Sequence, residues 1–247
     1  MWPRRLKQWI ALLPLTLLVT CDAPGSEHRA PEQRPPAARA ERLAPRPFIL
    51  GRREWHADEK AVREKPVYTG PVEVIFVHHT THSDTYDCKR DVPEMLRSME
   101  EHHIHDMGWN DLGYNFVVDR CGNIYEGRAG GVDRAVRGAH TKGFNVRSAG
   151  IAALGSFENG AKAPRPMLKA IAAIAAWKLS ARVNPEGRAK LTSTSDKSKY
   201  RKGTSVELYA ISGHRDGYDT DCPGATLYAA LPWIRKTAEQ MREKAAH

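Results

Sequence analysis

An apolar run that ends in two histidines constrains the fold of this chain more than any other feature. Residues 72–77 read Val-Glu-Val-Ile-Phe-Val, and His78 and His79 follow directly. β-Branched and aromatic residues favour a strand, and a strand that is apolar on nearly both faces belongs inside a covered sheet. The run therefore predicts a central strand with His78 at the rim of the sheet, where sites in α/β folds collect.

A second informative segment, residues 211–224, carries both a histidine and a cysteine. It reads Ile-Ser-Gly-His-Arg-Asp-Gly-Tyr-Asp-Thr-Asp-Cys-Pro-Gly, a composition typical of a loop. Imidazole and thiolate suit zinc better than calcium or magnesium, which prefer oxygen ligands. We predict that His78, His214 and Cys222 bind one catalytic zinc ion. Taken singly, each has a simpler explanation, since a lone histidine is usually just a polar residue and a lone cysteine a small buried hydrophobe.

The remaining patterns predict alternating strands and helices. Strands are expected at 113–119, 124–128 and 149–155, and helices at 91–105, 166–180 and 227–241. A break at Pro232 in the last helix is left open, and residues 184–205 are predicted to be a long polar excursion. The alternation indicates an α/β fold, with a central mixed β-sheet flanked by helices and the zinc site at the rim of the sheet.

The N-terminus has the features of an export signal. In residues 1–21, basic residues precede an apolar run at 10–20 that is too short to span a bilayer as a helix. Cys21 follows at the expected cleavage point, and Leu-Val-Thr-Cys resembles a bacterial lipoprotein box. Two alternatives stay open: a lipidated Cys21 that attaches the chain to a membrane, or an ordinary secretory signal. Either predicts a secreted or cell-surface protein.

The rest of the chain divides into a tether and a folded domain. Residues 22–48 are rich in Pro, Ala and Arg, a composition that cannot bury a core and predicts an extended linker. Residues 49–247 are expected to form the folded domain, and we expect it to act as a monomer. Hydrophobic residues make up 41% of the chain, enough for a core, and the net charge of +9 favours an anionic partner. Nucleic acid is not expected, because no long basic run is interleaved with aromatics.

Two groups of residues other than His78, His214 and Cys222 are candidates for further metal ligands or for a cross-link. Cys88 and Cys121 can form a disulfide in an exported protein, and Cys88 as a metal ligand is the alternative. His102, His103 and His105 suggest a second metal site, but a solvated helix face explains them as well, so no second site is predicted.

Several motifs together resemble the peptidoglycan recognition protein and type 2 N-acetylmuramoyl-L-alanine amidase family, in the style of its secreted actinomycete members. The resemblance spans roughly residues 49–240 and keeps the family's order. The motifs are Val77-His-His-Thr80, Gly108-Trp-Asn-Asp-Leu-Gly-Tyr-Asn-Phe116, Ile124-Tyr-Glu-Gly-Arg128, Gly138-Ala-His-Thr-Lys-Gly-Phe-Asn145 and His214 with Cys222-Pro.

The resemblance implies a zinc amidase that cleaves the bond between the lactyl group of N-acetylmuramic acid and L-alanine in peptidoglycan. It assigns zinc to His78, His214 and Cys222, and catalytic roles to Tyr114 and Thr220. Three protein ligands leave a position for water, which zinc activates near neutral pH. The Tyr114 hydroxyl is then a candidate donor to the developing oxyanion.

The resemblance also assigns a muropeptide groove to His79, Thr80, His140 and Asn145. Residues 127–134 depart from the animal pattern, which leaves the stem-peptide preference open. Two rival functions remain. One is a thiol hydrolase in which His214 activates Cys222, and the other is a module that binds peptidoglycan without cutting it.

Overall fold

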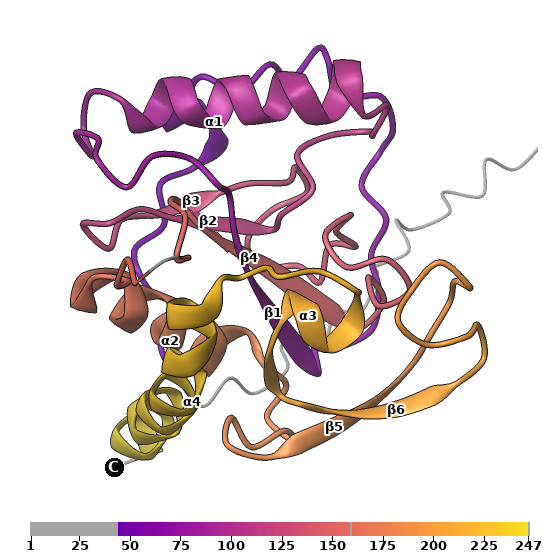
Figure 1. Cartoon of the computed structure of the whole chain (residues 1–247). Helices are drawn as coiled ribbons and strands as arrows, with labels where there is room; N and C mark the ends of the chain where they lie inside the picture. The colour runs from indigo at the N-terminus through magenta and orange to yellow at the C-terminus, as the bar shows by residue number, and fades with distance from the viewer. Residues whose placement is uncertain (1–43, 159, 247) are drawn as a thin grey trace, which may run out of the picture. The chain divides into compact units, whose positions relative to one another are not determined.

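The computed structural model describes residues 44–158 and 160–246, so the predicted export signal and most of the tether lie outside the described residues. A mixed five-stranded sheet forms the centre (Figure 1). Its strands are β1 (Val74–His79), β2 (Phe116–Val118), β3 (Ile124–Glu126), β4 (Ser148–Ala153) and β7 (Ile211–Gly213). Their order is β3-β2-β4-β1-β7, with β3 antiparallel to β2 and the other neighbours parallel. The predicted fold class is confirmed.

The apolar run forms the inner strand β1, as predicted, between β4 and β7. Residues 74–77 are completely buried, which explains why the run is apolar on both faces. His78 and His79 are the last two residues of the strand rather than the residues after it. Because β1 and β7 are parallel and Val77 pairs with Gly213, the next residue on each chain segment reaches the same edge of the sheet.

Two helices cover one face of the sheet. Helix α2 (Arg165–Lys178) and helix α4 (Ala225–Ala246) pack on the face that carries Ile75 and Val77. Helix α4 runs through Pro232 without a break, which settles the alternative left open by the sequence. Pro232 is exposed, so solvent can satisfy the carbonyl that loses its intrahelical donor.

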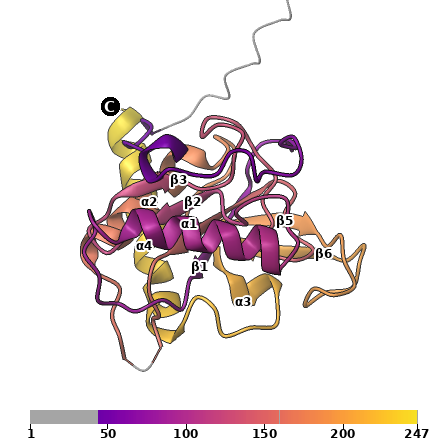
Figure 2. The same cartoon turned by 90° about the horizontal axis from the view of Figure 1, so that it is seen from above.

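The opposite face is covered in two separate places. Helix α1 (Val92–Glu101), continued by the short π-helix η2 (His102–Asp106), packs through Leu96 against Val117 of β2. At the other end, a hairpin of β5 (Arg188–Thr192) and β6 (Ser205–Tyr209) packs through Leu191 against Phe76. Figure 2 shows α1 lying across the sheet, with β5 and β6 beyond one of its ends. His78 shares this face with Phe76, because side chains two apart on a strand point the same way.

Two polar segments hold more regular structure than the sequence suggests. The polar excursion at 184–205 contains β5 and the loop that leads into β6. Leu191 and Leu208 face the core, while most of their neighbours in the two strands face solvent. Strands with so few buried residues have a mostly polar sequence, so no strand was predicted there. The predicted loop at 211–224 begins with β7 and the short helix α3 (His214–Gly217) before it becomes irregular.

The structure decides between the two alternatives for Cys88, a disulfide or a metal ligand. Cys88 and Cys121 form a disulfide that joins the segment before α1 to the turn between β2 and β3. The alternative of Cys88 as a metal ligand is therefore wrong, because its sulfur is already bonded.

Among the described helices, none has the length and apolarity needed to cross a membrane.

Candidate metal centre and active site

The three predicted metal ligands converge at one edge of the sheet. His78 ends β1, His214 begins α3 directly after β7, and Cys222 lies in the loop after α3. One ligand atom from each lies within 4.8 Å of the other two, and the imidazole centroids of His78 and His214 are 4.4 Å apart. His78 is 1% exposed and Cys222 is 7% exposed, whereas His214 is partly exposed, so the site is open to water on one side only.

Backbone hydrogen bonds hold the loop that carries Cys222. The backbone N–H of Arg215 donates to the Cys222 carbonyl at 3.0 Å, and the Arg215 guanidinium donates to the Asp221 carbonyl. The Cys222 N–H donates to Thr220 Oγ1 at 3.2 Å, and the His79 N–H donates to Cys222 Sγ at 3.3 Å. The position of Cys222 is thus fixed by hydrogen bonds from His79 at the end of β1 and within the loop itself.

Burial sets the protonation states of the three donors. It lowers the pKa of His78 well below its ordinary value, with further lowering by His214 and His140. Burial also lowers the pKa of His214 to about 4. Both imidazoles are therefore neutral near pH 7, the form that binds a metal. Burial raises the pKa of the Cys222 thiol to about 12, so without a bound cation the sulfur keeps its proton.

The donor set fits zinc. Two neutral imidazoles and a sulfur are ligands that Zn²⁺ prefers, and no carboxylate belongs to the cluster, as calcium or magnesium would require. The second candidate cluster in the described residues, Cys88, Asp119 and Cys121, cannot act in this way because its two sulfurs form the disulfide.

Tyr114 lies against the candidate metal ligands. Its ring centroid is 5.1 Å from that of His78. Burial and the neighbouring Cys222 raise the pKa of the Tyr114 hydroxyl, which therefore remains a proton donor at neutral pH. The Tyr114 carbonyl accepts a hydrogen bond from the Arg128 N–H at 2.8 Å, so the segment before β2 is anchored to the segment after β3.

His103 departs from the expectation of a solvated helix face. It is 6% exposed, whereas His102 and His105 are exposed. Its Nδ1 accepts a hydrogen bond from the Gly113 N–H at 3.1 Å, and its ring lies 4.6 Å from Trp109 and 5.6 Å from Tyr114. Burial lowers its pKa to about 4. The sequence did contain a signal, since position 103 continues the helical stripe of buried residues 92, 96 and 99.

His140 lies beneath His78 and is 6% exposed. Its Nδ1 is 3.3 Å from His78 Nε2 and 3.0 Å from Thr141 Oγ1. Thr141, which was not among the predicted site residues, is completely buried, with Oγ1 3.4 Å from His78 Nε2. Asn145 Oδ1 accepts the N–H groups of both His140 and Thr141 at 2.9 Å.

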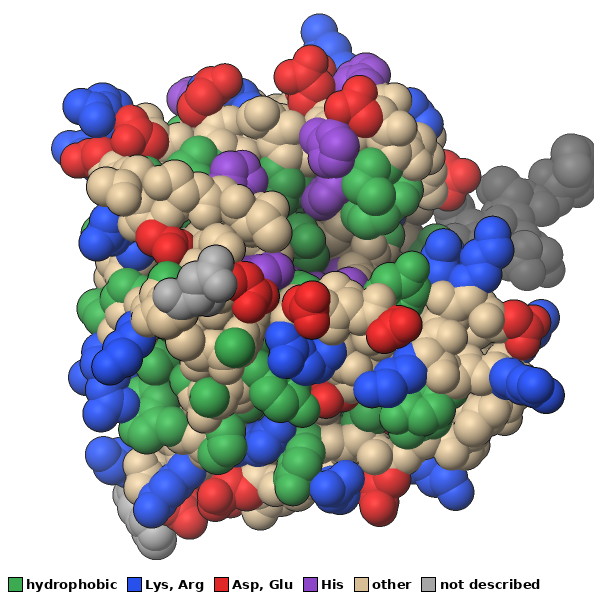
Figure 3. All heavy atoms as spheres, in the orientation of Figure 1, with side chains coloured by type: hydrophobic (Ala, Val, Ile, Leu, Met, Phe, Trp, Pro, Cys, Tyr) green, Lys and Arg blue, Asp and Glu red, His purple; other side chains and the backbone are tan. Residues whose placement is uncertain are grey.

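The other predicted groove residues flank the metal ligands. Thr80 Oγ1 accepts the Gly155 N–H at 3.2 Å. Among the described residues, the buried Nδ1 of His79 has no hydrogen-bond partner. Thr80 and Tyr114 line a pocket of about 590 Å³ whose other wall is the end of α1 and η2, including His103. Figure 3 shows histidine side chains gathered in and around a hollow on this face, below α1.

A second pocket, of about 390 Å³, lies beside Trp109. It is lined in part by Arg128, Arg137, Asn145 and Thr194. Because Trp109 packs against His103, which lines the first pocket, the two pockets flank one aromatic pair.

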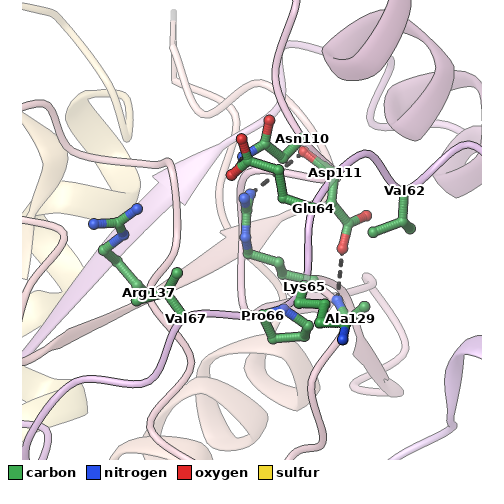
Figure 4. A pocket seen from close by; sticks show the side chains of 10 residues that line it. Val62, Glu64, Lys65, Pro66, Val67, Asn110, Asp111, Ala129 and Arg137 are labelled. Carbon is green, nitrogen blue, oxygen red and sulfur yellow. Dashed lines mark hydrogen bonds between the residues drawn. The ribbon is translucent and has the colours of Figure 1, made fainter. Parts of the chain in front are cut away.

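A third, smaller pocket contains none of the predicted site residues (Figure 4). Its volume of about 20 Å³ suits a single water molecule. Asp111 on its wall accepts the Ala129 N–H at 2.7 Å, and the buried Arg52 pairs with the same carboxylate at 3.2 Å. We interpret this pocket as part of the scaffold that holds the segment before β2.

Comparisons with known proteins agree with this geometry. Residues 68–225 match the family model described as N-acetylmuramoyl-L-alanine amidase. Peptidoglycan-recognition protein LB of Drosophila melanogaster is 28% identical over 183 residues, covering 74% of this chain and 67% of that protein. The human N-acetylmuramoyl-L-alanine amidase is 32% identical over 198 residues, covering 78% of this chain but 29% of that protein.

Solved structures show the same fold. Drosophila PGRP-LB matches with a TM-score of 0.56 and 25% identity, covering 74% of this chain and 92% of that one. Peptidoglycan recognition protein LE, solved with tracheal cytotoxin, matches with a TM-score of 0.57 and 26% identity, covering 74% and 91% of the two chains. The predicted resemblance is thus confirmed.

Proposed function

Because this chain belongs to the N-acetylmuramoyl-L-alanine amidase family, we propose that it is a zinc-dependent amidase of peptidoglycan. The reaction is hydrolysis of the amide between the lactyl group of N-acetylmuramic acid and L-alanine. Water adds to the carbonyl carbon, the C–N bond breaks, and the products are a lactyl carboxylate and the free amine of the stem peptide.

The observation that carries the proposal is the convergence of His78, His214 and Cys222. Three donors from β1, α3 and the following loop fit a zinc ion and leave one tetrahedral position free, as in catalytic rather than structural sites. A zinc ion held there would activate a water molecule and polarise the scissile carbonyl. The neutral imidazoles match this role near pH 7.

Two hydroxyl groups near the candidate metal ligands have different roles in the proposed reaction. The protonated Tyr114 hydroxyl lies beside the ligands and is placed to donate a hydrogen bond to the carbonyl oxygen as negative charge develops. The Thr220 hydroxyl accepts the Cys222 N–H, so its own proton is free to orient the water or the oxyanion. The two pockets beside Trp109 would hold the glycan and the stem peptide.

A thiol hydrolase fits the site less well. A nucleophilic cysteine needs a depressed pKa, but burial raises that of Cys222 to about 12. A binding module without catalysis is the second candidate, because the relatives include recognition proteins, one of them solved with tracheal cytotoxin. The complete set of metal donors favours catalysis.

The decisive experiment measures metal content and stem-peptide release from purified peptidoglycan by the exported form of the chain. We expect about one zinc per chain, and activity that disappears on chelation and returns with zinc. Activity that survives chelation but is lost on thiol alkylation would move the chemistry to Cys222. Bound zinc without cleavage of any wall type would leave a recognition module.

The proposal also includes where the protein acts, which is outside the membrane. We propose that residues 1–21 direct export and that 22–48 tether the domain outside the membrane, as the sequence predicts. Mass analysis of the mature protein separates the two alternatives for Cys21. A diacylglycerol adduct on Cys21 would indicate a lipoprotein, and an unmodified N-terminus would indicate secretion. Sedimentation of the same sample tests the expected monomer.

A further inference from the structure

We propose that His140 and Thr141 are positioning residues for the metal ligand His78, which they hold in one ring orientation and one tautomer. The inference rests on the proposed function only for the identity of the ion as zinc. The groove role that the resemblance assigns to His140 is a separate prediction.

The two nitrogens of His78 face different partners. Nδ1 lies 3.8 Å from Cys222 Sγ, on the side where the three metal donors converge. Nε2 lies 3.3 Å from His140 Nδ1 and 3.4 Å from Thr141 Oγ1, on the buried side. The geometry therefore assigns Nδ1 to the metal and Nε2 to the pair behind it.

This division determines where the protons lie. A histidine that binds metal through Nδ1 carries its proton on Nε2, so His78 Nε2–H must donate. His140 Nδ1 and Thr141 Oγ1 are the acceptors within reach. When Thr141 Oγ1 accepts this proton, its hydroxyl can in turn donate to His140 Nδ1 at 3.0 Å. The proton of His140 then lies on Nε2, a buried nitrogen with no hydrogen-bond partner among the described residues.

The scaffold leaves space for the His140 ring. A Cβ atom at Gly150, in the middle of β4, would lie 2.4 Å from His140 Cγ, and one at Gly138 would lie 2.4 Å from His140 Cδ2. A glycine inside a buried strand is costly, and it often marks a close approach by another group. Asn145 holds the same turn by accepting the N–H groups of His140 and Thr141.

His140 and Thr141 are also largely buried. They are 6% and 0% exposed, and neither lines the pockets beside Tyr114 and Trp109. Partners behind a metal-binding histidine fix its orientation and raise its basicity, and their loss costs roughly 10- to 100-fold in metal affinity.

The test measures zinc affinity by competition with a chelator in the full mature protein and its variants. His140→Leu removes the acceptor, whereas His140→Asn keeps an oxygen near the position of Nδ1. Thr141→Val removes the hydroxyl at nearly constant shape, and Thr141→Ser restores it. His102→Gln, on an exposed turn of the same face, is the matched control.

We expect zinc affinity to fall roughly 10- to 100-fold in His140→Leu and by a smaller factor in Thr141→Val. The conservative variants His140→Asn and Thr141→Ser should retain most of the parental affinity, and His102→Gln should show no loss. The visible spectrum of the cobalt-substituted protein should change in His140→Leu and stay close to that of the parent in His140→Asn, since it reports on ligand geometry.

Three results would overturn the inference. One is unchanged zinc affinity in folded His140→Leu. A second is an equal loss in His140→Leu and His140→Asn, which would indicate packing alone. A third is a raised KM with unchanged zinc affinity, which would return His140 to the substrate groove. A parent protein that binds zinc but cleaves nothing would refute the proposed activity while leaving this test intact.

Discussion

His78 and His214 lie side by side at the edge of the sheet although they are far apart in the chain, and their imidazole centroids are 4.4 Å apart. The parallel register of β1 and β7 produces this contact, because Val77 pairs with Gly213 and each histidine is the next residue. The placement of two of the three candidate metal donors is therefore a property of strand pairing. The loop that carries Cys222 adds the third donor.

Replacing the sulfur donor should remove the metal without unfolding the domain. In Cys222→Ser, we expect the zinc content to fall sharply and amidase activity to drop at least about a thousandfold, because metal assistance supplies several kcal/mol to the transition state. Metal analysis and stem-peptide release measure the two effects. Binding of a muropeptide should persist, and near-parental activity in the serine variant would exclude the metal mechanism.

Removing the Tyr114 hydroxyl should separate metal binding from turnover. Tyr114→Phe keeps the ring beside His78, so zinc content should match that of the parent. We expect kcat to fall roughly 10²- to 10³-fold, the usual cost of losing one oxyanion donor. Steady-state kinetics on a soluble muropeptide measure this, with KM nearly unchanged. If kcat stays the same, Tyr114 has no part in the chemistry.

The buried His103 should make stability depend on pH. Burial lowers its pKa from 6.5 to about 4, so the folded protein binds fewer protons there than the unfolded chain does. Its contribution is complete above pH 6.5 and is lost as the pH falls toward about 4. Urea unfolding of the metal-free protein between about pH 4 and pH 7.5 should therefore show stability falling with acidity.

A matched pair of variants isolates that effect. His103→Phe keeps a ring against Trp109 but cannot titrate, so its stability should vary less with pH than that of the parent. His105→Gln, on the exposed side of the same turn, should retain the parental slope. The buried His78 and His214, whose pKa values are also lowered, contribute to the slope in both proteins. Identical slopes in the parent and His103→Phe would therefore mean that His103 makes no contribution of its own.

The disulfide should support stability rather than catalysis. Cys88 and Cys121 are 33 residues apart, and closing a loop of that length is worth about 3–4 kcal/mol in the chain-entropy model. The double variant Cys88→Ser/Cys121→Ser should lose about that much free energy of unfolding. At a temperature where it stays folded, its kcat should remain within about twofold of the parental value. A large loss of kcat with native zinc content would instead connect the bridge to the site.

The sequence by itself determined the elements whose burial is nearly complete. The run at 72–77 predicts an inner strand because only a strand covered on both faces is apolar on both. The grouping of His78, His214 and Cys222 as candidate metal ligands was also predicted from the sequence, because it rested on side-chain chemistry and on the order of the motifs. The helices α1, α2 and α4 followed from their apolar stripes.

Only the tertiary structure decided which polar side chains are buried and what they face. His103 and its neighbour His102 belong to one polar stretch, yet packing under Trp109 buries the first and leaves the second exposed. His140 comes to lie behind His78 because Gly150 on β4 leaves room for its ring. The contact between His78 and His140 joins residues 62 apart in the chain, so local periodicity carries no information about it. The register of the sheet and the shape of the core determine it instead.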